Sequence, residues 1–283
     1  TVFLKGCPLR CKWCHNPEGL LPIRQISFLP AKCIFCGECV KVCTNSAHTL
    51  SEGEHELDRD ACVACGQCVE MCHPRALEAI GRDATVEEVL ADVLRDKPFY
   101  EHSGGGMTLS GGEPLVQIDF ADALLAAAKA EGLHCTVETC SYVDWSSIDR
   151  VRDKVDLFLC DIKDTDPAKH VELAGVEPDR IFENLRKLNA TGANMQIRLP
   201  IVPGHNDRKD HFEGVAKFVK SLDNEVSVEV MPYHRLGVGK QRRLGVDKSI
   251  ETFEAASPDD VMIADWLTTL KDLGVTVINE MKK

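Results

Sequence analysis

The sequence has no run of about 18 uncharged apolar residues, which a membrane-spanning helix needs, so no membrane association is predicted. It also has no charged-then-apolar leader, and it opens at Thr1 instead of a methionine, so we expect a short preceding segment to be missing. Lysine and arginine (33) are outnumbered by aspartate and glutamate (45), and the net charge of −12 argues against a nucleic-acid partner. The hydrophobic fraction, 44% of 283 residues, predicts a packed core and excludes a disordered, collagen-like or coiled-coil chain.

Cysteine is the residue that the sequence has in excess. There are 14 cysteines, and 11 of them lie within the first 72 residues, mostly three or four positions apart. Such close spacing favours ligation of a common metal centre over the disulfides of a small secreted scaffold. Thiols that serve as metal ligands need a reducing compartment, so a cytoplasmic location is predicted.

One run of four cysteines is repeated: the segment 33–43 recurs as 62–72, with every cysteine offset by 29 residues. The pattern C-x2-C-x2-C-x3-C, present twice, is typical of two-cluster bacterial ferredoxins, in which the fourth cysteine of each run ligates the other cluster. We therefore assign one [4Fe-4S] cluster to Cys33, Cys36, Cys39 and Cys72, and a second to Cys62, Cys65, Cys68 and Cys43. Structural zinc is the alternative, but its separated C-x2-C pairs do not explain a third cysteine at the same spacing.

The repeat is predicted to be an insert over residues 27–83 that interrupts a larger domain formed by residues 1–26 and 84–283. In that domain, strand and helix patterns alternate. Strands are expected at 1–5, 107–109, 134–138, 157–162, 195–199 and 226–231, with a last one at 275–278. Helices are expected near 85–93, 120–129, 145–153, 178–189 and 209–220, with a final one from Ser257 to Gly274. This alternation predicts a parallel sheet, either a doubly wound sheet or an open or closed barrel.

The end of the first strand carries a different cysteine motif, C-x3-C-x2-C, formed by Cys7, Cys11 and Cys14. Three cysteines can hold a four-iron cubane and leave one iron without a protein thiolate, which is an open coordination site. The alternative is that a fourth cysteine closes the site, and the spare cysteines are Cys135, Cys140 and Cys160. Cysteines in strand-like segments are more often small buried hydrophobic residues.

The end of the second strand reads Ser110-Gly111-Gly112-Glu113-Pro114. The two glycines allow the backbone to approach a ligand closely, and the carboxylate that follows can accept hydrogen bonds from an ammonium group. A Gly-Gly turn alone is a weak signal, but together with C-x3-C-x2-C it becomes specific.

With these motifs the chain resembles radical S-adenosylmethionine (SAM) enzymes. Within them it is similar to the glycyl-radical-enzyme activating enzymes that carry a two-cluster ferredoxin insert. The resemblance extends over essentially the whole chain and is carried by the segments 7–16, 110–114, 161–163, 198–204 and 232–237. It implies an α/β fold, a partial (β/α)6 radical SAM barrel with an inserted α+β bacterial-ferredoxin-like domain. Its active site is expected at the carboxyl ends of the strands.

The resemblance also implies the roles of individual residues. Cys7, Cys11 and Cys14 would hold the cluster to which SAM binds, and together with Lys163 they are the expected catalytic residues. The nucleoside would meet Trp13, His15 and His234. The methionyl end and ribose would meet Gly111, Gly112, Glu113, Arg198 and the segment Asp161-Ile162-Lys163. Glu138 and Thr139 stand where the family places a monovalent cation.

The implied activity is reductive cleavage of SAM to a 5′-deoxyadenosyl radical, which takes a hydrogen atom from one glycine of a partner enzyme. Eligible partners include choline lyase, glycerol or diol dehydratase, arylacetate decarboxylase, isethionate lyase and hydroxyproline dehydratase. With the insert, three [4Fe-4S] clusters are expected. The two in the insert would relay electrons from flavodoxin or ferredoxin, dock the partner, or serve structure alone.

Two other functions are compatible with parts of the sequence. One is a radical SAM enzyme that acts on a small molecule. The other is an electron-transfer polyferredoxin, which would not explain the segment 110–114, the Asp161/Lys163 pair or the β/α domain.

Overall fold

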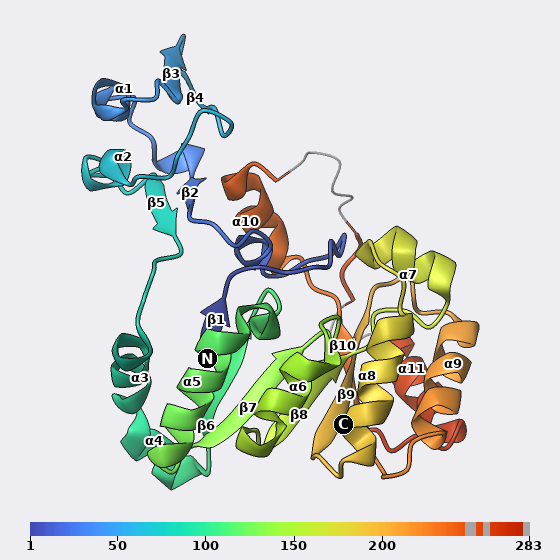
Figure 1. The fold of residues 1–283 in the computed structure, drawn as a ribbon. Coiled ribbons are helices and arrows are strands. Elements are labelled where there is room, and N and C mark those ends of the chain that lie inside the picture. The colour runs from blue at the N-terminus through green and yellow to red at the C-terminus, as the bar shows by residue number, and fades with distance from the viewer. Residues whose placement is uncertain (247–252, 257–260, 280–283) are drawn as a thin grey trace.

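The computed structural model describes residues 1–246, 253–256 and 261–279. Its centre is a six-stranded sheet in which the strand order follows the chain and all neighbours are parallel (Figure 1). The strands are β1 (Val2–Leu4), β6 (Gly106–Gly111), β7 (His134–Thr139), β8 (Leu157–Asp161), β9 (Met195–Ile201) and β10 (Ser227–Pro232). Because no described strand joins β1 to β10, the sheet is open. The predicted parallel α/β fold is confirmed.

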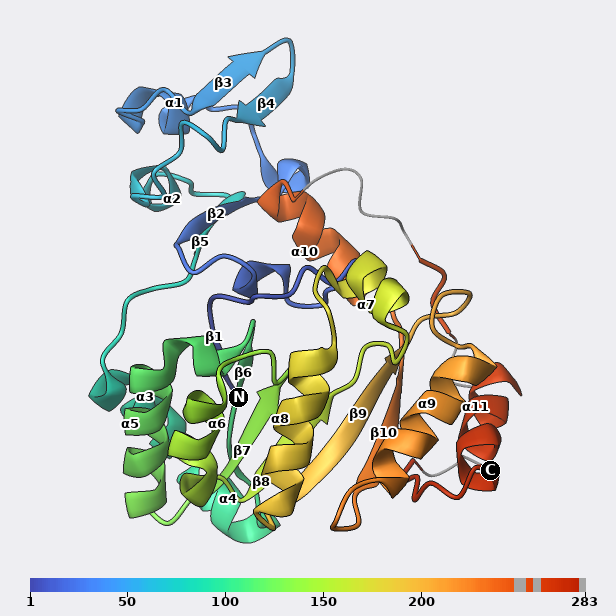
Figure 2. The same ribbon diagram turned by 45° about the vertical axis from the view of Figure 1, so that its right-hand side comes forward.

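Helices cover one face of this sheet, as both views show (Figures 1 and 2). Those that connect or follow the strands are α3 (Val86–Leu94), α4 (Lys97–Ser103), α5 (Ile118–Ala130), α6 (Trp145–Val151), α8 (Asp179–Ala190), α9 (Lys209–Lys220) and α11 (Val261–Asp272). The main core lies between these helices and the sheet, because alternate strand residues such as Ile197 and Leu199 are fully buried there. None of the described helices has the length and apolarity needed to cross a membrane.

Two helices at the carboxyl end of the sheet were not predicted: α7 (Pro167–Ala174) and α10 (Leu236–Leu244). The first is capped by Asp166, whose carboxylate accepts a hydrogen bond from the backbone N–H of Lys169 at 2.8 Å. Their sequences give little apolar periodicity, and their positions depend on contacts with the loop that follows β1.

The carboxyl-terminal prediction is wrong in one respect, since residues 275–278 form no strand. A single parallel bridge joins Val277 to Val228. Backbone pairing does not continue to Val230, because the side chain of Asn279 bonds both of its backbone groups. The amide oxygen of Asn279 accepts from the N–H of Val230 at 2.7 Å, and the amide nitrogen donates to its C=O at 2.9 Å. The predicted helix start at Ser257 lies outside the described residues, whereas its predicted end at Gly274 agrees with α11.

The cysteine repeat forms a lobe apart from the sheet (Figures 1 and 2). Strand β2 (Gln25–Phe28) pairs antiparallel with β5 (Leu77–Ile80), and the hairpin of β3 (His48–Ser51) and β4 (Glu54–Leu57) lies near the remote end. The short helices α1 (Glu38–Val42) and α2 (Gln67–Glu70) carry the third cysteine of each run. The lobe has its own small core, which includes Ile26, Phe28 and Leu77.

Candidate functional site

A cavity of about 480 Å³ opens at the carboxyl ends of the strands, a size typical of small-molecule sites. Its lining combines the loop after β1 with residues from β6 to β10. Most of the predicted site residues line it: Cys7, Cys11, Trp13, Cys14, His15, Gly111, Gly112, Glu138, Thr139, Asp161, Lys163, Arg198 and His234. The fold therefore brings together groups that are up to 227 positions apart in the chain.

The cysteine loop is held by backbone hydrogen bonds on both sides. The N–H of Gly6 donates to the carbonyl of Gly19 at 2.7 Å, and the N–H of Arg10 donates to the carbonyl of Ala174, the last residue of α7, at 2.8 Å. Leu9 is 1% exposed and packs against Ala174. The loop is thus positioned by α7, although it has no regular secondary structure of its own.

The three thiols of this loop form a donor set that suits an iron–sulfur cluster. Burial raises the pKa of Cys11 to about 12 and that of Cys14 to about 11, so neither is a thiolate at neutral pH without a bound cation. A hydrogen bond from the Cys140 thiol lowers the pKa of Cys7. Three soft ligands that become thiolates on metal binding are the chemistry that a cluster requires.

Cys140 is a spare cysteine that lies at the site. It lines the cavity beside Cys7, whereas the other two spare cysteines, Cys135 and Cys160, are fully buried in the core on the helix-covered side of the sheet. The difference arises because Cys140 follows the end of β7, and the other two point inward from β7 and β8.

The glycines after β6 have a structural reason beyond ligand approach. Gly111 has φ +122°, and the N–H of Gly112 donates to the carbonyl of Leu4 at 2.9 Å. A Cβ on Gly112 would overlap the backbone carbonyls of Gly6 and Gly19. The two glycines therefore let the β6 turn lie directly against the cysteine loop.

Two predicted residues lie behind the cavity wall and do not line it. Glu113 is fully buried, and its carboxylate accepts from the Thr139 hydroxyl and the Cys140 N–H, both at 2.8 Å. Burial raises its pKa, although these hydrogen bonds oppose the change. Ile162 is 1% exposed in the main core, because neighbouring positions along an extended chain face opposite sides.

A row of charged side chains lies along the cavity floor. The ammonium of Lys163 lies 2.8 Å from a carboxylate oxygen of Asp161, and the guanidinium of Arg198 lies 2.8 Å from one of Glu138. The hydroxyl of Ser110 donates to the other oxygen of Glu138 at 2.5 Å. Burial alone would lower the pKa of Lys163, but the carboxylate of Asp161 raises it, so the lysine stays charged.

One carboxylate oxygen in this row has no hydrogen-bond partner among the described residues. Oδ1 of Asp161 is buried and accepts no hydrogen bond from the described residues, and Nε of Arg198 is 4.0 Å away from it. A buried acceptor without a donor is costly, so this atom is suited to a ligand hydroxyl or ammonium group.

Glu229 and Asn279 also line the cavity, although neither was predicted from the sequence. Glu229 is in register with Arg198 on the neighbouring strand, and its carboxylate lies 3.8 Å from the guanidinium. The signal was present in the alternation of β10, since Val228 and Val230 face the core and Glu229 must face the opposite side.

An aromatic wall closes the other side of the cavity. The rings of His15 and His234 stack with centroids 4.0 Å apart and planes within 12°, and Nε2 of His15 is 2.8 Å from the carbonyl oxygen of His234. Trp13 is 5% exposed and packs edge-on against Phe253. Flat, stacked surfaces of this kind suit a planar ligand such as a nucleobase.

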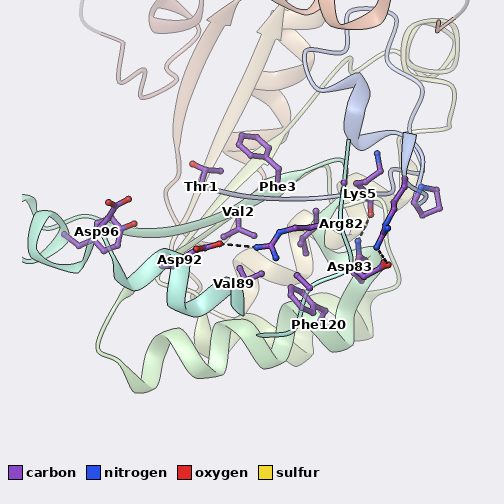
Figure 3. A pocket seen from close by; sticks show the side chains of 18 residues that line it. Thr1, Val2, Phe3, Lys5, Arg82, Asp83, Val89, Asp92, Asp96 and Phe120 are labelled. Carbon is purple, nitrogen blue, oxygen red and sulfur yellow. Dashed lines mark hydrogen bonds and ion pairs between the residues drawn. The ribbon is translucent and has the colours of Figure 1, made fainter. Parts of the chain in front are cut away.

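A second cavity, about 550 Å³, lies outside the open edge of β1 (Figure 3). It is bounded by Val2, by α3 and by Phe120 of α5, and it contains an ion pair of Arg82 with Asp92 at 3.1 Å. No cysteine and none of the predicted site residues line it. Of these two large cavities, only the first therefore carries predicted site residues.

The lobe contains two further small cavities, and each brings four cysteines together. One is lined by Cys33, Cys36, Cys39 and Cys72, with His55; the other is lined by Cys43, Cys62, Cys65 and Cys68, with His48. In both, the fourth cysteine comes from the opposite run of the repeat.

Comparison with known proteins gives the family. The family profile described as "Radical SAM superfamily" matches residues 1–219. The chain is 41% identical over 283 residues to the choline trimethylamine-lyase activating enzyme of Oleidesulfovibrio alaskensis, covering 98% of this chain and 91% of that protein. It is 40% identical over 247 residues to the trans-4-hydroxy-L-proline dehydratase activating enzyme of Clostridioides difficile, covering 86% of this chain and 82% of that protein.

Solved structures agree on the fold. A domain of the pyruvate-formate lyase-activating enzyme from Bacteroides vulgatus superposes with a TM-score of 0.52 at 24% identity, covering 61% of this chain and 97% of that chain. Since the chain matches the superfamily profile over most of its length and these relatives over nearly all of it, it belongs to the radical SAM superfamily and, within it, to the family of glycyl radical enzyme activating enzymes.

Proposed function

We propose that this chain activates a glycyl radical enzyme, using SAM and a [4Fe-4S] cluster held by Cys7, Cys11 and Cys14. The observation that carries the proposal is the arrangement of these three cysteines beside a charged floor and an aromatic wall in one cavity. When bound, the cluster and SAM supply a 5′-deoxyadenosyl radical that removes a hydrogen atom from a glycine of the partner.

The residues of the floor would bind the methionyl end of SAM. Arg198 offers a guanidinium to the carboxylate, and Lys163 keeps Asp161 oriented while the free oxygen of Asp161 accepts from the ligand. His15, His234 and Trp13 would hold the adenosine, with the stacked rings fixing its plane. These contacts place the reacting carbon and exclude water around it.

Glu113 takes a positioning role in this proposal. Its carboxylate fixes the Thr139 hydroxyl and the Cys140 N–H at the end of β7, so it shapes the cavity wall from behind. The monovalent cation expected beside Glu138 and Thr139 stays a prediction from the resemblance. Both Glu138 oxygens already have partners in Arg198 and Ser110, so a cation there would have to share them.

The lobe is proposed to be a ferredoxin-like insert with two more [4Fe-4S] clusters. Support comes from its two cavities, which group the eight cysteines in the crossed manner that the repeat predicts. Flavodoxin or ferredoxin is the proposed electron donor, and the chain is proposed to act in the cytoplasm. A polyferredoxin without catalysis is excluded, because the superfamily match spans residues 1–219.

The first test is formation of 5′-deoxyadenosine by full-length protein, reconstituted anaerobically with iron and sulfide, reduced and given SAM. We expect product from the wild type and from Cys135→Ala, a matched change in the core, and none from Cys11→Ala. Equal product from Cys11→Ala would overturn the cluster assignment.

The second test addresses the partner. Electron paramagnetic resonance should detect a glycyl radical when the reconstituted protein, SAM and a candidate partner are mixed, with choline trimethylamine-lyase as the first candidate. Product 5′-deoxyadenosine without a glycyl radical in any of the eligible partners would favour a small-molecule substrate instead.

A further inference from the structure

Two histidines of the β3–β4 hairpin connect the two cysteine cavities of the lobe. His55 lines the cavity of Cys33, Cys36, Cys39 and Cys72, and His48 lines the other. Nδ1 of His48 lies 3.0 Å from Nε2 of His55, within hydrogen-bond distance. The histidine pair therefore lies between the two predicted clusters.

The hairpin fixes both rings. His48 pairs with Leu57 across the ladder and His55 pairs with Leu50, so the two histidines are diagonal neighbours on one face. Glu52 and Gly53 form the tight turn with φ of 45° and 84°. His48 is 4% exposed, and the ring of Phe28 packs against His55 with centroids 4.4 Å apart.

The chemistry of the neighbouring sulfur determines where the protons lie. Nδ1 of His55 is 3.4 Å from Sγ of Cys33. A ligating thiolate has only lone pairs, so the ring nitrogen nearest to a sulfur, Nδ1 of His55, is assigned the proton and donates to Cys33. Nε2 of His55 is also 3.7 Å from Sγ of Cys39, but it has a closer partner in Nδ1 of His48 at 3.0 Å. With the single proton of a neutral imidazole on Nδ1, Nε2 accepts from His48, and every nitrogen of the pair that faces a short contact is matched.

The histidines break the symmetry between the two halves of the repeat. Each half also supplies a backbone donor at the same place: the N–H of Ala47 lies 3.3 Å from Sγ of Cys43, and that of Ala76 lies 3.2 Å from Sγ of Cys72. These two contacts are offset by 29 residues, like the cysteines. The positions 29 residues after His48 and His55 are Leu77 and Ala84, which offer no side-chain donor.

We propose that His55 donates a hydrogen bond to the Cys33 thiolate and thereby raises the reduction potential of that insert cluster above the potential of its neighbour, while His48 holds His55 in the donating tautomer. Hydrogen bonds to cluster sulfurs stabilise the more negative, reduced state, which is why they raise the potential. The inference rests on the proposed two-cluster insert. Both histidines are positioning residues, since neither ligates iron.

The cluster whose reduction potential His55 raises would lie beside α1 and the hairpin. Both are at the end of the lobe remote from the sheet (Figure 2). The other cluster would lie between it and the body of the protein. A higher potential at the remote cluster favours its reduction first by an external donor. The pair thus gives the two similar cysteine runs different redox roles.

The test is a redox titration of the full-length, reconstituted protein, followed by electron paramagnetic resonance, with iron counted per chain. In His55→Phe we expect the reduction equilibrium of one insert cluster to become about tenfold less favourable, which is about 59 mV for one electron. His55→Gln keeps an N–H donor and should restore part of this shift. His48→Leu should cause a smaller shift in the same cluster, because the tautomer is no longer fixed.

His73→Phe is the matched control, because His73 is exposed, lies beside Cys72, and has no side-chain hydrogen bond among the described residues. Unchanged potentials in His55→Phe with about twelve irons, or an equal shift in His73→Phe, would overturn the inference. If His55→Phe assembles fewer irons, its potentials cannot be compared with the wild type, and His48→Leu is used instead because it leaves the Cys33 contact in place. A shifted potential in His48→Leu would support the inference, and an unchanged potential would overturn it.

Two outcomes separate this inference from its premises. About four irons in the wild type would mean that the two-cluster insert fails, and the inference fails with it. Side-chain atoms of Cys39, His48 and His55 also lie within 4.8 Å of one another. Stoichiometric zinc in the wild type that is lost in His55→Phe would make the pair a metal site and overturn the hydrogen-bond role.

Discussion

At the residue scale, Arg198 lies close to the carboxylates of three different strands on the floor of the cavity. Its guanidinium contacts Glu138 on β7 at 2.8 Å and is within 4.0 Å of carboxylate oxygens of Asp161 on β8 and Glu229 on β10. Burial would lower its pKa, but Asp161 and Glu138 outweigh this effect and raise it. With Lys163, two cations face three carboxylates, so the floor keeps a net negative charge that suits a cationic ligand group.

Cys140 is the residue whose substitution separates an open cluster from a closed one. In Cys140→Ala we expect the full iron content and SAM cleavage within about tenfold of the wild type, since a lost hydrogen bond to Cys7 is worth about 1 kcal/mol. Iron per chain and the rate of 5′-deoxyadenosine formation measure this. Loss of about four irons would identify Cys140 as a fourth ligand.

At the element scale, the turn after β6 and the loop after β1 form one unit, because their backbones touch. Gly112→Ala should displace the loop, since the added Cβ overlaps the carbonyls of Gly6 and Gly19. We expect a destabilisation of about 1–3 kcal/mol and a loss of SAM cleavage. Thermal unfolding and product formation would be measured together.

The control for this change is Gly239→Ala in α10, where an added Cβ meets nothing within 4 Å. It should be neutral or slightly stabilising, because alanine favours the helix. A wild-type cleavage rate in Gly112→Ala would show that the loop is more adaptable than its contacts indicate.

Helix α9 introduces a pH dependence through His211, which is fully buried and accepts the N–H of Thr165 at 3.1 Å. Burial lowers the pKa of His211 to about 4. As the pH falls below the ordinary value of about 6.5, the unfolded state therefore binds this proton first. The free energy of unfolding should decrease toward pH 4, by up to about 1.4 kcal/mol per pH unit from this group.

His211→Gln keeps an acceptor for Thr165 but does not titrate, so its denaturant unfolding should depend less on pH between 7 and 5. His102→Gln, on the exposed surface of α4, should leave the wild-type slope unchanged. If the free energy of unfolding changed equally with pH in the wild type and in His211→Gln, His211 would not be the source of the pH dependence.

At the scale of the whole molecule, the residues that the structure describes make few polar contacts between the lobe and the body. Arg59 donates to the carbonyl of Arg243 at 2.8 Å, and the guanidinium of Arg243 pairs with Glu78 at 2.5 Å. The lobe also has a separate core. Its cysteines can therefore be changed with little effect on the packing of the sheet.

Cys36→Ala tests whether the lobe delivers electrons. We expect about four fewer irons per chain, and SAM cleavage that slows more with reduced flavodoxin than with a small chemical reductant. Cys11→Ala, in contrast, should fail with both reductants. An equal rate of flavodoxin-driven cleavage in Cys36→Ala and the wild type would argue for a structural or docking role of that cluster.

Much of the architecture follows from local patterns. The strands at β6, β7, β8, β9 and β10 match the predicted segments within a few residues, because alternating or continuous apolar runs between turn signals specify buried parallel strands. Helices α7 and α10 were missed, since each is determined by its contacts with the cysteine loop and by little apolar periodicity of its own. The sequence of residues 275–278 is typical of a strand, but the side chain of Asn279 accepts the hydrogen bond from the Val230 N–H of β10 that a paired strand would accept.

The sequence alone determined the cysteine motifs, the repeat and the order of strands and helices, because ligand spacing and hydrophobic periodicity are local properties of the chain. Tertiary structure alone decided which cysteine lies beside Cys7, that Glu113 points behind the wall, and that Glu229 meets Arg198. It also decided that His48 and His55 meet between the two cysteine sets. These outcomes depend on strand register and on side-chain direction at element ends, which arise only when distant segments pack together.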